Sequence, residues 1–115
     1  MDIIELNRIE KIVKRRNKFV HRILTENERM VWDRFENEKR KLEFLAGRFA
    51  AKEAVAKAFG TGIGELSFQH IEVLSNKKGA PNVSVKGKES FHIFLSITHS
   101  REFAAAQAVV EKKED

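Results

Sequence analysis

The chain has 115 residues, of which 42% are hydrophobic and 34% are charged. This composition is typical of one small globular domain and excludes a disordered chain. The sequence contains no cysteine, which excludes disulfides, thiolate nucleophiles and cysteine-based zinc sites. No apolar run is long enough to span a bilayer, and the acidic residues near Met1 are unlike a signal peptide, so we expect a cytoplasmic protein without a membrane partner.

The formal net charge is +5, and a basic cluster lies between residues 8 and 22. One acidic residue, Glu10, lies there among eight basic ones: Arg8, Lys11, Lys14, Arg15, Arg16, Lys18, His21 and Arg22. Such a cluster attracts a nucleic acid, an acidic protein or a phosphorylated small molecule. Charge alone does not choose among these partners.

The start of the chain has the apolar periodicity of a helix. Apolar residues recur at spacings of three and four from Ile3 to Val13, which predicts a first helix with Asp2 as its N-cap. The opposite face of this predicted helix carries basic side chains of the cluster. Asn17 interrupts the pattern, and a short apolar run follows at residues 19–23.

Two further helices are predicted before residue 60. Thr25 and Glu28 have the spacing of a capping box, so a second helix should begin there. Its inward-facing residues should be Met30, Val31 and Phe35. Residues 36–41 are mostly charged and predict a loop. A third and longest helix should run from about Leu42 to Phe59 and end at Gly60, because glycine commonly follows the last turn of a helix.

The pattern changes after residues 61–64, which form a glycine-containing connector. Alternating and β-branched residues predict strands at residues 71–73, 83–85, 93–98 and 104–110. A hairpin turn should join the first two strands and a tight polar link the last two. Helices followed by a small antiparallel sheet predict the α+β fold class, with a single domain over residues 1–115.

The densest group of chemically useful side chains lies in the third predicted helix. On a helix, Phe49, Glu53 and Lys57 fall one turn apart along one face. A carboxylate beside an ammonium group can hold a hard metal ion next to a phosphate whose oxygens the lysine neutralises. The simpler interpretation is an exposed Glu–Lys pair at i,i+4, which stabilises a helix by roughly 0.2–0.5 kcal/mol.

The segment from Phe49 to Lys57 resembles the F/W-x-x-K-E-A/S-x-x-K motif of the 4′-phosphopantetheinyl transferases and matches it at every defined position. The wider segment 44–64 is similar to the short bacterial holo-acyl-carrier-protein synthases of that family, as are residues 2–9, 95–100 and 103–106. These separated segments follow the order of the family and cover nearly the whole chain. The resemblance implies a 4′-phosphopantetheinyl transferase-like fold.

The resemblance also implies an activity, namely transfer of the 4′-phosphopantetheine group from coenzyme A to a serine of apo acyl carrier protein in support of fatty acid biosynthesis. In the family the magnesium ligands match Asp2 and Glu53, and the metal also holds the pyrophosphate of coenzyme A. Lys57 matches the lysine that stabilises or protonates the departing adenosine bisphosphate. Either Glu53 or a metal-bound water takes the proton of the serine, and the sequence does not decide between them.

Further residues follow from the resemblance for the coenzyme A site. These cofactor-binding candidates are Lys39, Arg40, Arg48, Lys57, Gly60, Gly62 and His99. Each has a structural alternative: the basic pair as a solvated run, the glycines as a helix cap and a turn, and the histidine as a turn residue.

The family docks its acidic carrier protein on the first helix, which gives the basic cluster a partner. The carrier-binding candidates are Arg8, Ile12, Arg15, Arg16, Lys18, Phe19 and Arg22. The alternative for Phe19 is a place in the hydrophobic core. Short members of the family form homotrimers with active sites shared between neighbours, and we expect the same assembly here.

Two features depart from the family pattern. Family members usually have a short apolar strand with glycines before the aspartate, whereas this chain opens at Met1-Asp2. A Gly-Lys-Pro turn of the relatives is Gly79-Ala80-Pro81 here, which removes one phosphate contact.

Two other functions compete with the transferase interpretation. A small basic nucleic-acid-binding domain would use the basic cluster, with Trp32 or phenylalanines stacking on bases. Against it, the sequence has no zinc-finger spacing, no RNP-like strand and no helix-turn-helix. A helical adaptor for an acidic protein would leave the segment from Lys52 to Lys57 without a role.

Overall fold

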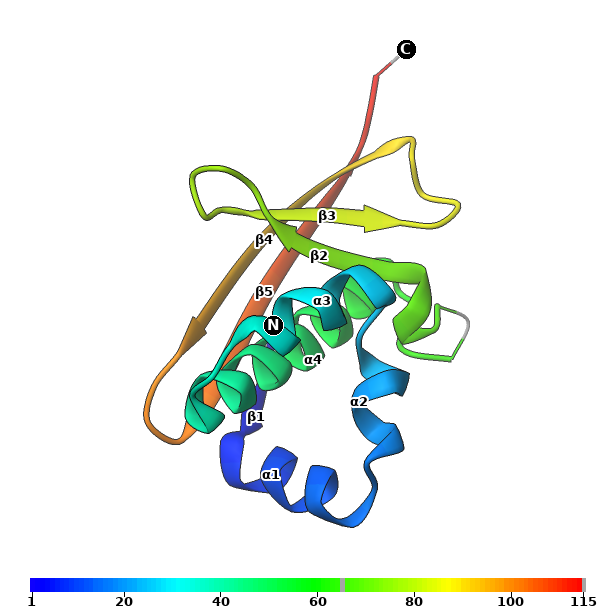
Figure 1. The fold of residues 1–115 in the computed structure, drawn as a ribbon. Helices are drawn as coiled ribbons and strands as arrows, with labels where there is room; N and C mark the ends of the chain where they lie inside the picture. The colour runs from blue at the N-terminus through cyan, green and yellow to red at the C-terminus, as the bar shows by residue number, and fades with distance from the viewer. Residues whose placement is uncertain (65, 115) are drawn as a thin grey trace.

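The computed structural model describes residues 1–64 and 66–114 and centres on one long helix, α4 (Glu38–Ala58). A sheet packs on one side of α4, and three shorter helices pack around the rest of it (Figure 1). These helices are α1 (Leu6–Arg15), α2 (Lys18–Ile23) and α3 (Glu26–Arg34). The α+β class predicted from the sequence is confirmed.

Two antiparallel sheets complete the structure. The larger one has the order β1-β5-β4 and is formed by β1 (Asp2–Glu5), β5 (Phe103–Lys112) and β4 (Phe91–His99). The smaller one is the hairpin of β2 (Ile71–Ser75) and β3 (Pro81–Val85), preceded by the short helix η1 (Phe68–His70). All four predicted strands are therefore present, and both predicted hairpins are confirmed.

The contact between α4 and the larger sheet is built from small side chains. Ala104 and Ala106 of β5 are buried, as are several alanines of α4. A Cβ atom added to Gly47 would lie 3.2 Å from Cγ2 of Ile97 on β4, which is closer than ordinary packing allows. The absence of a side chain at Gly47 is thus what allows α4 to approach the sheet so closely.

Strand β1 was not predicted, and Asp2 is not the N-cap of a helix. The structure pairs Asp2 with Ala106 and Glu5 with Phe103, so residues 2–5 extend the sheet before α1 begins at Leu6. The helical spacing of Ile3 was fortuitous, because its side chain is 57% exposed on the outer face of the sheet. A strand of four residues is too short for its period to compete with that of the following helix.

Helix boundaries were predicted with mixed success. The capping box of Thr25 and Glu28 is present and begins α3, but Met30 is 54% exposed rather than inward-facing. Helix α4 begins at Glu38, inside the region predicted as a loop, because the Asn37 side chain accepts hydrogen bonds from the first backbone N–H groups. Its end is as predicted, with Gly60 at a φ of 78°. Among the described residues, no helix is long and apolar enough to cross a bilayer.

Candidate active site

Three side chains meet where β1 and the carboxyl-terminal half of α4 lie together. Lys57 Nζ donates a hydrogen bond to Asp2 Oδ1 at 2.6 Å. Glu53 lies one turn before Lys57 on α4, and its carboxylate is close enough to Asp2 for the two negative charges to repel. The sequence prediction that Asp2, Glu53 and Lys57 form one site is thus compatible with their placement, although Asp2 reaches it from a strand.

The electrostatics of this group favour a bound cation. Burial raises the pKa of Glu53, the Asp2 carboxylate raises it further, and Lys57 and Arg8 oppose the shift. The hydrogen bond to Asp2 raises the pKa of Lys57, so its ammonium group stays protonated at neutral pH. Two carboxylates held in mutual repulsion are stabilised by a positive ion between them.

The carboxylates open into a cleft of about 270 Å³ between β1, α1 and α4. Asp2 and Glu53 line it together with Arg8, Ile12 and Phe19, which are three of the residues predicted to bind a carrier protein. The cleft therefore brings the two sets of predicted residues together, because Ile12 and Phe19 line the same hollow as the two carboxylates.

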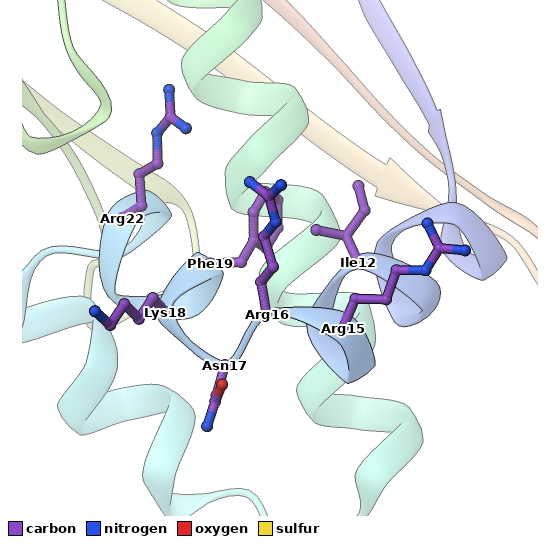
Figure 2. Close-up of a pocket in the computed structure, with 7 residues that line it drawn as sticks. All are labelled: Ile12, Arg15, Arg16, Asn17, Lys18, Phe19 and Arg22. Atoms are coloured by element: carbon purple, nitrogen blue, oxygen red, sulfur yellow. The ribbon is translucent and has the colours of Figure 1, made fainter.

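A second and larger hollow, of about 750 Å³, lies at the junction of α1 and α2. We call it the docking groove, and its lining residues are Ile12, Arg15, Arg16, Asn17, Lys18, Phe19 and Arg22 (Figure 2). Its rim is basic, and its apolar part is formed by Ile12 and Phe19. Phe19 is half-buried against Phe49, with ring centroids 6.1 Å apart, so it belongs to the core and to the surface at once.

The residues predicted to bind coenzyme A fall into two groups at opposite ends of α4. Lys39 and Arg40 lie exposed on its first turn. His99 is near them, because its Nδ1 lies 3.3 Å from Oε2 of Glu43. Gly60 and Gly62 follow the other end of the helix. The first turn and Lys57 are about 27 Å apart at 1.5 Å per residue, too far for one compact phosphate site in a single chain.

Arg48 is engaged by its own chain. Its Nε donates to the carbonyl oxygen of Val73 at 3.1 Å, and its guanidinium group lies 4.2 Å from the centre of the Phe44 ring. Burial lowers the pKa of Arg48, and Glu28 opposes that shift. These contacts use one face and the Nε donor of the guanidinium group. A phosphate would therefore bind to Arg48 through the terminal nitrogens.

A buried ion pair next to the site was missed by the sequence interpretation. Lys52 Nζ lies 2.6 Å from Oε1 of Glu28, and both side chains are fully buried. The capping box singled out Glu28 and the family motif singled out Lys52, but nothing local pairs residues so far apart in the chain. Burial lowers the pKa of Lys52, and Glu28 opposes this shift.

The described residues contain no cluster of three or more His, Cys, Asp or Glu side chains that could hold a metal. Two carboxylates are nevertheless the donor set that magnesium commonly takes from a protein when phosphate oxygens and water complete its shell. Asp2 and Glu53 fit that requirement.

Comparisons with known proteins identify the family of this chain. The model of the 4′-phosphopantetheinyl transferase superfamily matches residues 1–108. The chain belongs to this superfamily. A holo-[acyl-carrier-protein] synthase of Oceanobacillus iheyensis is 54% identical over 114 residues. The match covers 99% of this chain and 95% of the relative. One of Bacillus velezensis is 52% identical and covers 97% of this chain and 93% of the relative.

Solved structures of the superfamily have the same fold. The crystal structure of a holo-(acyl-carrier-protein) synthase from Bacillus anthracis, in complex with CoA (3′,5′-ADP), aligns with a TM-score of 0.87 at 52% identity and covers 98% of this chain and 93% of that one. The Helicobacter pylori enzyme in complex with coenzyme A aligns with a TM-score of 0.83 at 37% identity and covers 96% of each chain. The family and fold predicted from the sequence are confirmed.

Proposed function

We propose that this chain is a holo-acyl-carrier-protein synthase that transfers 4′-phosphopantetheine from coenzyme A to a serine of apo acyl carrier protein. The observation that carries the proposal is the cleft in which Asp2 and Glu53 lie beside Ile12 and Phe19 of the docking groove. Relatives with this fold are named holo-acyl-carrier-protein synthases, and two of their structures hold coenzyme A or its 3′,5′-ADP part.

The reaction makes one bond and breaks another. The serine oxygen bonds to the phosphorus that carries pantetheine, the bond from this phosphorus to the bridging oxygen of the pyrophosphate breaks, and adenosine 3′,5′-bisphosphate leaves. Glu53 is our candidate for accepting the serine proton, because its carboxylate lines the cleft beside Ile12 and Phe19, where the serine of the carrier would enter. Lys57, protonated at neutral pH, neutralises charge on the leaving phosphate.

Magnesium is the proposed cofactor, held by Asp2 and Glu53. When bound, it would make the phosphorus more electrophilic and offset charge on the leaving group. The repulsion between the two carboxylates supports this assignment. The ion pair between Asp2 and Lys57 also places the lysine beside the metal ligands, where phosphate oxygens would lie.

We further propose a homotrimer in which neighbouring chains share each active site. The two groups of coenzyme A residues lie about 27 Å apart along α4, so one chain would supply Lys57 and its neighbour Lys39, Arg40 and His99. The outer face of the larger sheet supports an assembly, because it leaves Ile3, Phe94, Phe103 and Val109 between 42% and 57% exposed. Exposed apolar patches of this kind mark subunit interfaces.

A subunit-mixing experiment tests the shared site. Glu53→Gln and Arg40→Glu chains should each be inactive alone, because each spoils one half of every site. Co-expressed in equal amounts, they should recover about a quarter of wild-type activity, the share of interfaces at which two intact halves meet in a cyclic assembly. Activity that stays at the level of the separate variants, in mixed assemblies verified by mass, would contradict sharing.

The carrier protein should dock through the rim of the docking groove. Arg16→Glu is expected to lower kcat/KM for the carrier by about tenfold at low salt, because charges on a rim chiefly raise association rates. The KM for coenzyme A should not change. Arg34→Glu, which makes the same charge change on α3 outside the groove, is the matched control. Equal effects of both variants would show that net charge rather than the groove attracts the carrier.

The decisive test of the activity is the transfer itself. The protein, coenzyme A, magnesium and an apo acyl carrier protein are mixed, and the carrier is examined for the mass of a phosphopantetheine group. The rival function predicts no transfer and salt-sensitive binding of DNA or RNA. Trp32 gives that rival little support, because its Nε1 donates to the Lys41 carbonyl oxygen and the Lys41 ammonium lies 4.4 Å from its ring centre.

A further inference from the structure

Lys52, the neighbour of Glu53 on α4, is a fully buried lysine with all three of its N–H donors in use. Its Nζ donates to Glu28 Oε1 at 2.6 Å, to the carbonyl oxygen of Ile23 at 2.7 Å and to that of Phe68 at 3.0 Å. An ammonium group is costly to remove from water, so such complete satisfaction is needed to keep it buried and charged.

Glu28 is satisfied in the same way from the other side. Its Oε1 also accepts from the backbone N–H of Thr25 at 2.8 Å, and its Oε2 accepts from the backbone N–H of Val73 at 2.7 Å. The pair therefore joins α4 to the last residue of α2, the start of α3, the helix η1 and strand β2.

The packing of α4 gives this pair a special part in setting the rotation of the helix. The buried residues around Lys52 are largely alanines, among them Ala50, Ala51, Ala54 and Ala56. Alanines present low ridges, which resist rotation of a helix about its axis less than interlocked large side chains do. The ammonium group of Lys52 donates to three acceptors in fixed directions. It can reach all three in only one rotation of α4 about its axis.

We propose that Lys52 is a positioning residue for the transfer reaction, which aims Glu53 at Asp2 and sets the distance between α4 and α2, the helix that carries one side of the docking groove. Adjacent helical residues point about 100° apart, so anchoring Lys52 in the core directs Glu53 toward the cleft. A rotation of about 20° would move a carboxylate about 5–6 Å from the helix axis by about 2 Å. Misplacement by about 1 Å can cost about 100-fold in rate.

This inference rests on the proposed transferase function, and the two fail in different ways. Wild-type protein that does not modify a carrier would refute the function. Wild-type protein that does so, while folded variants without the ion pair do so equally well, would refute only the role of Lys52.

The experiment compares Lys52→Met, which keeps the length of the side chain without the charge, with the double variant Glu28→Gln/Lys52→Met, which leaves no unpaired buried charge. Val55→Ala is the matched control, because it removes buried volume from the same helix and leaves the pair intact. Each protein is assayed at about 10 °C with sucrose, which favours the folded state. Near-ultraviolet circular dichroism of the single tryptophan gives the folded fraction.

A positioning role predicts that kcat per folded molecule falls at least about tenfold in both ion-pair variants, with the KM for coenzyme A changed less than about threefold. Val55→Ala should keep the wild-type kcat even if its melting temperature falls as far as that of the ion-pair variants. A purely structural role predicts instead that kcat per folded molecule stays at the wild-type value. That outcome would overturn the proposal, and so would failure of both variants to fold under these conditions, since the pair would then serve folding itself.

Discussion

Replacing Glu53 by glutamine should lower kcat for phosphopantetheine transfer by about 10³-fold. Glutamine has the size of glutamate but cannot accept the serine proton and is a poor ligand for magnesium, so one change removes both proposed roles. The measurement is the rate at which apo carrier gains the phosphopantetheine mass, at saturating coenzyme A and carrier. Wild-type protein in EDTA should be similarly inactive, and magnesium should restore only the wild type. Retention of kcat within about threefold would refute the assignment of Glu53.

The same variant should not be less stable than the wild type, which separates a chemical defect from an unfolded protein. The pKa of Glu53 is raised in the folded state above its ordinary 4.5. The folded state therefore binds more protons in that interval, and the contribution of Glu53 to the free energy of unfolding decreases as the pH rises above 4.5. Glutamine is neutral at every pH, so it avoids the cost of holding a charge at this position in the folded state.

Thermal unfolding in EDTA checks this sign. At neutral pH the Glu53→Gln variant should melt at the same or a higher temperature than the wild type. Any difference should shrink at about pH 4, where Glu53 is mostly protonated in both the folded and the unfolded wild type. A lower melting temperature of the variant at neutral pH would contradict the raised pKa of Glu53, which burial and the Asp2 carboxylate produce together.

Replacing Lys57 by methionine should lower kcat by about 100-fold, because the site loses the cation that neutralises the leaving phosphate. Lys57→Arg keeps the charge and should recover part of the activity, although arginine presents its donors in a different geometry. Both variants are measured as kcat and KM for coenzyme A in the transfer assay.

The matched control for this lysine lies in the turn between β2 and β3. Lys77 is exposed there, outside the candidate site, and Lys77→Met makes the same change of charge and shape. It should leave kcat unchanged. If Lys57→Met and Lys77→Met behave alike, the ion pair of Lys57 with Asp2 is incidental to the chemistry.

Local sequence signals predict those parts of the fold that are decided by neighbouring residues. The capping box of Thr25 and Glu28 is complete within three residues, and Gly60 ends α4 because a positive φ suits glycine. Strand β1 has no such signal, since it exists only because β5, about 100 residues later in the chain, offers hydrogen bonds to Asp2 and its neighbours. Tertiary pairing of that kind overrides local periodicity.

The candidate site divides in the same way. Spacing on a helix placed Glu53 and Lys57 on one face, but only the resemblance to a family brought Asp2 to them, because a strand at one end and a helix in the middle meet through tertiary structure. The buried partner of Lys52 was likewise out of reach, since Glu28 lies on another helix. The sequence pattern alone does not show which helices and strands lie close together in the folded chain.

The alanine contact between α4 and β5 has a consequence for how the protein adapts to its ligands. An alanine side chain has no rotamers, so a layer made of them cannot adjust by turning side chains. A side chain at Gly47 would press on Ile97, so the close approach of helix and sheet depends on the glycine. Accommodation of a large substrate must therefore come from whole elements shifting together or from the segments around this block, and not from side chains turning within it.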